Sequence, residues 1–305
     1  EPNIPAATSE TKTSNLDKVF WPDEGYTKGD LIDYYRTVAP SLLPYLADRP
    51  LTLVRFPDGI DGKSFFQKNA PDFVPTSIRT EWIDSSNPDE GSAGNNFFVC
   101  ESVEALTYII NLGAIPLHVR ASRVASIDRP DWCVLDLDPK TAPFTAVVQV
   151  ARAIRSLCDD IDLPCYVKTS GKTGLHILIP MGPRYDFEQQ KLLGELIARV
   201  IEGQMPDIAT TIRSPSKRGD KVYLDFVQNG RGKLIVGPYS VRPVPGATVS
   251  TPLRWSEVTP KLDPTRFTIR SAPRRIGRMT NDPLAPVLTD RPDIAASLRA
   301  LAAKM

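Results

Sequence analysis

Apolar side chains recur along the chain at two different spacings. Apolar positions three or four residues apart predict amphipathic helices, and short alternating or continuous apolar runs predict strands. The helical spacing covers residues 27–46, 102–113, 143–158 and 186–203. The extended segments are residues 51–56, 115–119, 132–138, 165–169, 175–180, 221–227 and 234–236. Strands outnumber the helices that could cross between parallel neighbours, which favours an α+β fold with mixed or antiparallel sheets flanked by helices.

Three local signals refine these elements. Thr27 followed by Asp30 resembles a capping pair at the start of the first helix. Pro40 or Pro44 is expected to bend that helix, because an interior proline removes a backbone donor and clashes one turn back. The pair Asn229-Gly230 predicts a tight hairpin that joins the strands 221–227 and 234–236.

The ends and the apolar runs of the chain indicate its class. Residues 1–14 are polar and have no apolar period, so we expect a flexible tail there and order from Asn15 onward. No apolar run reaches the length of a membrane span and no basic-then-apolar leader is visible, which predicts a cytoplasmic protein with no membrane partner. The first residue is Glu1 rather than Met, as expected for a piece of a longer protein.

Composition excludes several other classes. Of the 305 residues, 41% are hydrophobic and 24% are charged, which excludes a fibrous or disordered chain. The four cysteines have no short paired spacing, so we expect reduced thiols in the core rather than a zinc cluster. They are Cys100, Cys133, Cys158 and Cys165.

Charge is balanced overall but unevenly distributed. Lys and Arg total 37 against 36 Asp and Glu, so the net charge of +1 does not by itself indicate a polyanionic partner. Residues 81–104 contain six acidic residues and no basic one, whereas residues 213–242 contain seven basic residues against two acidic. Residues 266–278 contain five arginines and no acid. Each run is either a solvated face or a binding surface.

Paired carboxylates provide the first candidate chemistry. Asp136 and Asp138 are two apart on the strand 132–138, so both side chains point to the same face. Carboxylates this close repel each other unless a cation neutralises them, and a divalent ion held with substrate phosphates does so. The alternative is a polar strand end with two solvated acids.

A third carboxylate strengthens the metal hypothesis. Asp225 is the only acid in the apolar strand 221–227, where an unpaired charge is costly. If this strand lies beside the strand of Asp136, three carboxylates can hold two metal ions that activate a hydroxyl and stabilise a leaving pyrophosphate. The alternative is that Asp225 pairs with Lys221 or Arg218.

A turn with two glycines follows the strand 165–169. Its exposed N–H groups, with donors from Ser170, Lys172 and Thr173, suit a triphosphate. It is not a Walker A motif, because Tyr166 stands where that motif requires glycine and a strand follows where it requires a helix. His176 just after the turn can donate to a phosphate oxygen, or it is a hydrogen-bonded core residue.

The order of these motifs resembles a known family. A strand with Asp-x-Asp, then Ser-Gly-x-x-Gly-x-His, then a late single Asp is the pattern of the archaeo-eukaryotic primase superfamily. The chain is similar to its bacterial branch, the polymerase domain of ATP-dependent DNA ligase D in non-homologous end joining. The resemblance covers residues 15–284, which leaves 285–305 as a C-terminal helical extension. It implies a primase-polymerase fold with two mixed or antiparallel sheets.

The resemblance also implies roles for individual residues. The metal ligands for two Mn²⁺ or Mg²⁺ ions are Asp136, Asp138, Asp225 and His118, and the three aspartates are the catalytic residues. Residues that bind the incoming ribo- or deoxyribonucleoside triphosphate are Ser170, Lys172, Thr173, His176, Lys221, Gln228 and Arg242. Arg218 faces the primer 3′-end, and Lys18 and Lys28 grip a 5′-phosphate of DNA. The template contacts are Arg55, Phe65 and Phe66, and Val54 stands where relatives often carry lysine.

These roles predict a template-directed nucleotidyltransferase that adds nucleotides to primer 3′-ends at gaps and double-strand breaks. The resemblance further implies a preference for ribonucleotides, and Ku and a ligase domain as partners. Three alternatives stay open: a non-catalytic module that bridges DNA ends, a metal-dependent nuclease, and a primase that starts chains without a primer.

Overall fold

The computed structural model describes residues 11–84 and 94–302. Its α-helices are α1 (Lys28–Leu46), α2 (Val103–Asn111), α3 (Phe144–Asp160), α4 (Phe187–Gln204), α5 (Ala272–Ile276) and α6 (Ile294–Ala302). Its strands are β1 (Val19–Trp21), β2 (Tyr26–Thr27), β3 (Pro50–Arg55), β4 (Phe65–Gln67), β5 (Thr80–Asp84), β6 (Gly94–Val99), β7 (Ala114–Val119), β8 (Trp132–Asp138), β9 (Tyr166–Thr169), β10 (Leu175–Pro180), β11 (Ala209–Thr210), β12 (Val222–Asp225), β13 (Ile235–Val236) and β14 (Pro252–Leu253). Short 3-10 helices cover residues 124–126, 215–217, 255–257, 264–266 and 285–288.

In the described residues the strands form two large sheets and one small one. The first sheet has the order β13-β7-β3-β6-β5, with β4 paired to β3, and all of its pairs are antiparallel. The second has the order β11-β12-β8-β10-β9-β14 and is antiparallel except where β11 lies beside β12. Strands β1 and β2 form a separate antiparallel pair. The predicted α+β fold with mixed and antiparallel sheets is confirmed.

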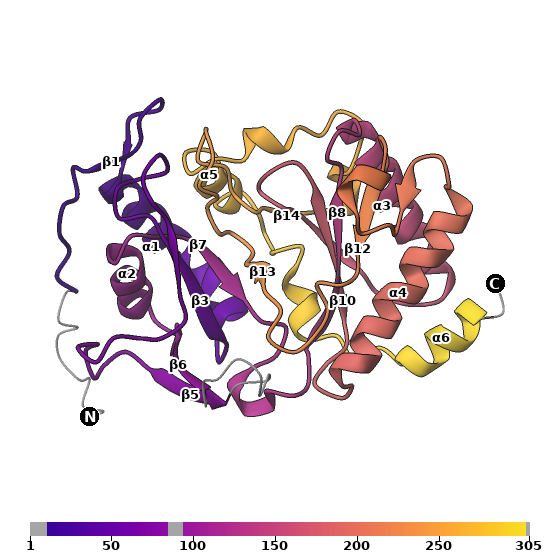
Figure 1. Cartoon of the computed structure of the whole chain (residues 1–305), viewed down its shortest axis with the longest axis horizontal. Helices are drawn as coiled ribbons and strands as arrows, with labels where there is room; N and C mark the ends of the chain where they lie inside the picture. Colours follow the sequence, from indigo (N-terminus) through magenta and orange to yellow (C-terminus); the bar gives the residue numbers. More distant parts are fainter. Residues whose placement is uncertain (1–10, 85–93, 303–305) are drawn as a thin grey trace.

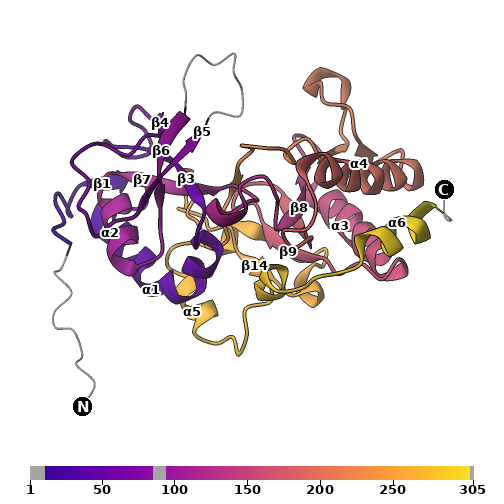
Figure 2. The same cartoon turned by 90° about the horizontal axis from the view of Figure 1, so that it is seen from below.

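Each large sheet packs against its own pair of helices (Figure 1). Helices α1 and α2 lie beside the first sheet, and α3 and α4 cover one face of the second, as Figure 2 shows from another side. On β8, Leu135 and Leu137 belong to the core beneath α3 and α4. Trp132 and Val134 belong to the core of the first sheet. Asp136 therefore lies on the inner face of the second sheet, between the two cores.

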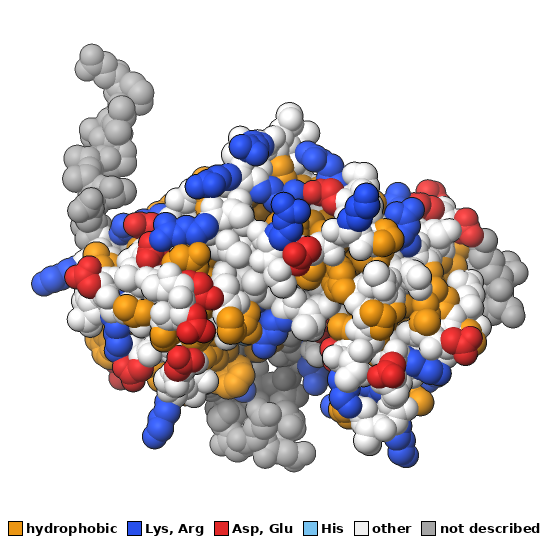
Figure 3. Space-filling model, turned by 90° about the horizontal axis from the view of Figure 1, so that it is seen from above, with side chains coloured by type: hydrophobic (Ala, Val, Ile, Leu, Met, Phe, Trp, Pro, Cys, Tyr) orange, Lys and Arg blue, Asp and Glu red, His pale blue; other side chains and the backbone are white. Residues whose placement is uncertain are grey.

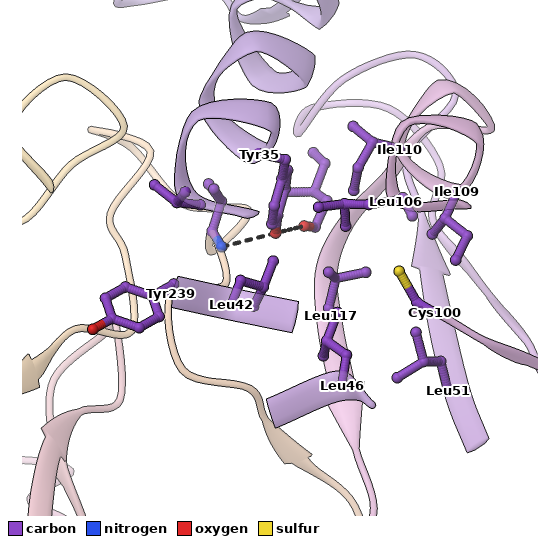
Figure 4. Close-up of a cluster of buried hydrophobic side chains, with 14 of the residues drawn as sticks. Tyr35, Leu42, Leu46, Leu51, Cys100, Leu106, Ile109, Ile110, Leu117 and Tyr239 are labelled. Atoms are coloured by element: carbon purple, nitrogen blue, oxygen red, sulfur yellow. Dashed lines mark hydrogen bonds between the residues drawn. The ribbon is translucent and has the colours of Figure 1, made fainter. Parts of the chain in front are cut away.

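The first core joins segments that are far apart in the sequence (Figure 4). The Tyr35 hydroxyl of α1 donates to the Ile115 carbonyl (2.6 Å) and accepts from the N–H of Val241 (3.0 Å). Burial raises the pKa of this hydroxyl to about 12, so it stays a neutral donor. The bond to Val241 anchors the chain next to Arg242, one of the predicted nucleotide-binding residues.

The predicted hairpin at Asn229-Gly230 is wrong. Strand β12 pairs with β8 and β11 in the second sheet, whereas β13 pairs with β7 in the first. The Asn229 side chain is buried and bonds the backbone of Val134 on β8, accepting from its N–H (2.8 Å) and donating to its carbonyl (2.7 Å). Asn229 thus acts as a tertiary bridge at the point where the chain crosses between sheets, and not as a hairpin turn.

Other local expectations have mixed outcomes. The capping pair is confirmed, because Thr27 and Asp30 form a complete capping box at the start of α1. Helix α1 continues through Pro40 and Pro44 to Leu46, and the expected bend stays a prediction. All four cysteines are buried and free. Among the helices of residues 11–84 and 94–302, none has both the length and the apolar character needed to cross a bilayer.

The two ends of the described chain pack onto the fold. Residues 1–10 of the expected tail lie outside the described residues, but Ser14 N–H donates to the Asn111 side chain of α2 (3.0 Å). Tertiary contacts therefore begin before Asn15, where the sequence suggested that order starts. At the other end, Ile294 and Leu301 of α6 are buried in the second core.

Candidate active site

Three predicted carboxylates lie at the end of two neighbouring strands. Asp225 of β12 is directly opposite Asp136 of β8, and Tyr223 is opposite Asp138. Side chains directly opposite each other in an antiparallel pair project from the same face of the sheet. The predicted shared site requires these two strands to be neighbours, and they are.

Asp136 is flanked on its other side by His176 of β10, which is its direct partner in the sheet. The His176 Nε2 atom lies 3.4 Å from Asp136 Oδ1. Burial by itself would raise the pKa of Asp136, but His176, together with Lys168 and Arg242, outweighs burial and lowers that pKa. Asp136 is therefore an ionised carboxylate inside the fold at neutral pH.

The other two carboxylates accept bonds from nearby donors. Asp225 accepts from the N–H of Val227 (2.9 Å) and the side chain of Gln228 (3.0 Å). Burial raises the pKa of Asp225, and the charge of Asp136 adds to that effect. Neither of the basic residues suggested as its partner pairs with Asp225. Arg218 instead bonds Asp138 Oδ2 (3.2 Å).

Lys168 is a residue of this site that the sequence analysis did not single out. It is fully buried on β9 opposite His176, and its Nζ lies 2.7 Å from His176 Nδ1. The same ammonium donates to the Val236 carbonyl (3.0 Å) and to Ser250 Oγ (2.7 Å). Burial lowers the pKa of Lys168 well below its usual value, and the charge of Asp136 opposes that effect. In its protonated form Nζ can only donate, so Nδ1 then accepts and His176 carries its proton on Nε2, toward Asp136. A charged residue inside an apolar strand singled out Asp225, and the same signal could have identified Lys168.

For the predicted nucleotidyltransferase activity, we expect Lys168→Met to reduce turnover about 10–100-fold with little change in the KM for nucleotide. Losing a residue that orients a side chain beside a metal site has effects of this size. Steady-state primer extension with Mn²⁺ measures both constants. Lys191→Met on the exposed side of α4 is the matched control. A variant with normal turnover would show that Lys168 does not position His176.

The glycine turn closes tightly against the carboxylate strand. Ser170 Oγ accepts from the N–H groups of Lys172 (3.2 Å) and Gly174 (3.1 Å), so it organises the turn itself. A Cβ atom at Gly174 would lie 2.1 Å from the Leu137 carbonyl oxygen. Gly171 has a φ of 72°, which side chains rarely adopt. Both glycines are required for the turn to lie this close to β8.

One cavity of about 230 Å³ brings most of the predicted nucleotide and metal residues together. The predicted site residues in its lining are His118, Asp136, Asp138, Ser170, Lys172, Thr173, His176, Gln228 and Arg242. Arg242 is mostly buried, and its Nε has no hydrogen-bond partner in the described part of the chain. Burial lowers the pKa of His118 to about 4, and its buried Nδ1 likewise lacks a partner among the described residues.

Two predicted basic residues do not line this cavity. Arg218 is buried over the ring of Tyr223, with its guanidinium carbon 3.7 Å from the ring centre, and bonds Asp138 at the rim of the site. Lys221 donates to the Pro206 carbonyl (2.6 Å) and does not line the cavity. The structure therefore brings Arg218 to the carboxylates and leaves Lys221 outside.

The donor set at the carboxylates fits a hard divalent ion. Burial is the main cause of the raised pKa of Asp225, and repulsion by Asp136 contributes to it. A cation between the two carboxylates would remove that repulsion. The unpartnered imidazole nitrogen of His118 is a further ligand atom at the same cavity. As they stand, however, no group of three His, Cys, Asp or Glu side chains within residues 11–84 and 94–302 is arranged to hold a metal ion.

A second group of predicted residues lies on the first lobe, by which we mean the first sheet together with α1, α2 and the β1–β2 pair. The Lys28 N–H donates to the Lys18 carbonyl (2.8 Å), and its Nζ donates to the Ser14 carbonyl (2.8 Å). Burial lowers the pKa of Lys28, and the nearby charges of Lys18 and Arg55 lower it further. Lys18 forms an ion pair with Asp58 (2.5 Å). Three cations therefore influence one another here, with one carboxylate beside them.

The predicted template residues are at the surface. Phe65 and Phe66 are 45% and 71% exposed on the short strand β4, so they are not core residues. The Arg55 guanidinium carbon lies 5.1 Å from the centre of the Phe65 ring, and Arg55 also donates to the Leu112 carbonyl (2.6 Å). Exposed rings beside a cation are the composition of a surface that stacks bases.

Comparisons with known proteins bear on this arrangement. The model of the family described as "LigD, primase-polymerase domain" matches residues 27–284. The bifunctional non-homologous end joining protein LigD of Bacillus subtilis is 36% identical over 265 residues, which cover 86% of this chain and 42% of that protein. The multifunctional LigD of Pseudomonas aeruginosa is 31% identical over 298 residues, covering 96% of this chain and 35% of that protein. The chain thus spans less than half the length of these relatives.

A solved structure is also similar over nearly the whole chain. It is the polymerase domain from Mycobacterium tuberculosis ligase D in complex with DNA, with a TM-score of 0.85 and 29% identity. The match covers 93% of this chain and all of that one. The sequence and fold therefore agree: this chain belongs to the LigD primase-polymerase domain family, which consists of polymerase- and primase-type nucleotidyltransferases.

Proposed function

We propose that this domain adds nucleotides, templated by DNA, to primer 3′-ends at gaps and double-strand breaks in non-homologous end joining. One observation carries the proposal: a single small cavity is lined both by the carboxylates Asp136 and Asp138 of β8 and by the cations Lys172 and Arg242. Such a cavity suits a triphosphate, whose oxygens face the cations, with its reacting phosphorus toward the carboxylates.

In this proposal the cationic wall binds the triphosphate. Arg242 is mostly buried, and its Nε lacks a hydrogen-bond partner among the described residues, so an anion in the cavity would supply one. The Lys172 ammonium adds a second cation to the cavity, whereas the N–H groups of Lys172 and Gly174 are engaged by Ser170 Oγ. His176, which carries its proton on Nε2, orients Asp136.

Asp136, Asp138 and Asp225, with His118, would hold two Mn²⁺ or Mg²⁺ ions. When bound, these ions would lower the pKa of the primer 3′-hydroxyl and neutralise charge on the leaving pyrophosphate. Asp138 becomes available as a ligand when Arg218 releases it, and Arg218 then faces the primer end. Ribonucleotide preference requires a contact with the 2′-hydroxyl, for which Ser170 at the cavity is the candidate.

The first lobe would hold the DNA end. Lys18 and Lys28 bind the 5′-phosphate across a gap, and Arg55 with the exposed rings of Phe65 and Phe66 places the template base. The DNA-bound solved relative supports this assignment of partner. A ligase domain and Ku are further partners, which we propose only on the resemblance to the family.

Primer extension tests the proposal. A labelled primer on a gapped, 5′-phosphorylated duplex is incubated with Mn²⁺, with and without nucleotides, and ribo- and deoxyribonucleotides are compared at equal concentration. Growth only with nucleotides supports the proposal, and faster growth with ribonucleotides supports the sugar preference. Shortening of the primer would favour the nuclease, and binding without any growth would favour the end-bridging module. Synthesis on a circular single-stranded template would indicate a primase.

We expect Lys28→Ala to weaken binding to a gapped duplex that carries a 5′-phosphate roughly tenfold, because a charge-assisted phosphate contact is lost. Binding to the same duplex with a 5′-hydroxyl should change little. Fluorescence anisotropy with both duplexes measures the difference, and Lys63→Ala, an exposed lysine on the same lobe, is the control. Equal losses for the two duplexes would remove the phosphate pocket.

A further inference from the structure

The basic run 266–278 is not used by the proposed function. Two of its five arginines are paired: Arg270 with Asp30 (3.1 Å) and Arg275 with Glu257 (2.5 Å). In the described residues, no hydrogen bond or ion pair engages the side chains of the other three, which are Arg266, Arg274 and Arg278. The run is therefore only partly neutralised within the fold.

Unpaired cations of this run border a second cavity, the C-terminal basic cavity, of about 500 Å³. Its cationic lining residues are Arg254, Lys261, Arg266, Arg275 and Arg278, against two acids, Glu257 and Asp263. Its two acids are already engaged, since Glu257 is paired with Arg275 and Asp263 accepts from the Thr265 N–H (3.0 Å) and hydroxyl (2.6 Å). The cavity thus presents uncompensated positive charge.

The same cavity contains apolar surface. Leu262, Phe267 and Met279 line it, and the Arg275 guanidinium carbon lies 5.4 Å from the centre of the Phe267 ring. Cations combined with an aromatic ring in a concave surface suit single-stranded nucleic acid, whose phosphates contact the cations while its bases pack on the ring.

A third cavity connects the basic cavity with the active site. This connecting cavity, of about 390 Å³, shares Lys172 and Thr173 with the active-site cavity, and Leu262 and Asp263 with the basic cavity. Lys140 also lines it. Figure 3 views the molecule from the top of Figure 1, where α5 lies. Lys and Arg side chains gather across the centre and along the upper edge of this view. The three cavities thus share lining residues, and Lys140 and Lys172 are the cations of the connecting one.

We propose that the single-stranded part of a DNA end runs from the active-site cavity past Lys140 and Lys172 into the C-terminal basic cavity. This proposal rests on the proposed function, since it assumes that the active site acts on DNA ends. The cavity lengthens the footprint on a tailed end and holds the tail away from the catalytic carboxylates.

The test uses the triple variant Arg254→Gln, Arg266→Gln, Arg278→Gln. The matched control, Lys191→Gln, Arg199→Gln, Arg299→Gln, removes as many charges from α4 and α6. Fluorescence anisotropy measures binding to a duplex with a 3′ single-stranded tail of about 12 nucleotides, and to the blunt duplex, over a series of salt concentrations. Circular dichroism and thermal unfolding verify that both variants fold.

For the tailed duplex we expect the triple variant to bind about tenfold more weakly than the control at low salt. The slope of log K against log salt should fall by about 2, which corresponds to three lost phosphate contacts on a single strand. Binding to the blunt duplex should match the control. Equal slopes for variant and control on the tailed duplex, or equal losses on both duplexes, would overturn the proposal.

The same DNA separates this inference from the proposed function. Primer extension by the unaltered protein is scored independently, because tail binding needs no catalysis. If the unaltered protein extends primers but the triple variant binds tailed DNA as well as the control does, the proposed function stands and the role of the basic cavity is refuted. Tail-dependent loss without extension supports the cavity and removes the polymerase assignment.

Discussion

Asp136→Asn is expected to reduce primer extension by on the order of 1,000-fold or more, while binding to a 5′-phosphorylated gap stays within about twofold of normal. Asn retains the size of the side chain and its bond to His176 but removes the negative charge. That charge lies at the centre of the site, directly opposite both Asp225 and His176. Extension assays with Mn²⁺ and anisotropy with gapped DNA measure the two effects.

Asp128→Asn is the matched control for this variant. Asp128 is an exposed carboxylate that pairs with Arg231 (2.8 Å), and its loss should leave extension unchanged. Undiminished extension by Asp136→Asn would refute the catalytic assignment. Loss of both extension and DNA binding would indicate that Asp136 serves the fold rather than the reaction, and thermal unfolding would then show a lower melting temperature.

Arg242→Gln is expected to raise the KM for nucleoside triphosphate about 100-fold, which corresponds to about 2.7 kcal/mol. The reason is that Arg242 is a mostly buried guanidinium whose Nε lacks a partner among the described residues and that lines the active-site cavity. The bound triphosphate would supply that partner. Initial rates over a range of nucleotide concentrations measure the effect, and binding to DNA should be unchanged.

Two further variants sharpen this result. Arg231→Gln removes an exposed arginine from the same stretch of chain and should leave the KM unchanged. Arg242→Lys keeps the charge but loses the forked donor geometry, so its KM should lie between those of the unaltered protein and Arg242→Gln. A normal KM for Arg242→Gln would contradict binding of the triphosphate at this wall.

Local signals predicted the elements well where one segment decided its own structure. The strands 132–138 and 175–180 have the predicted bounds, because each is a short, mostly apolar run next to a turn. The first helix begins at the predicted capping pair. The hairpin prediction failed because the Asn229 side chain bonds the backbone of β8. These tertiary hydrogen bonds outweigh the local preference of Asn-Gly for a hairpin turn.

The candidate site divides in the same way. Asp136 and Asp138 could be placed on one face from their spacing alone. Lys168 could not be assigned a role, because its partners His176, Val236 and Ser250 come from three other segments of the chain. The basic run 266–278 was visible in the sequence, but which arginines are neutralised depends on acids as distant as Asp30.

The sequence by itself determined seven of the described strands (β3, β7, β8, β9, β10, β12 and β13), the starts of α1 to α4, the spacing of the paired carboxylates and the two glycines of the turn, because these depend on contacts within a few residues. Only the tertiary structure decided that Asp225 lies opposite Asp136, that a buried lysine contacts Nδ1 of His176, and that three cavities share lining residues. Those features depend on which strands pair and which charges find partners, and such choices are made across the whole chain.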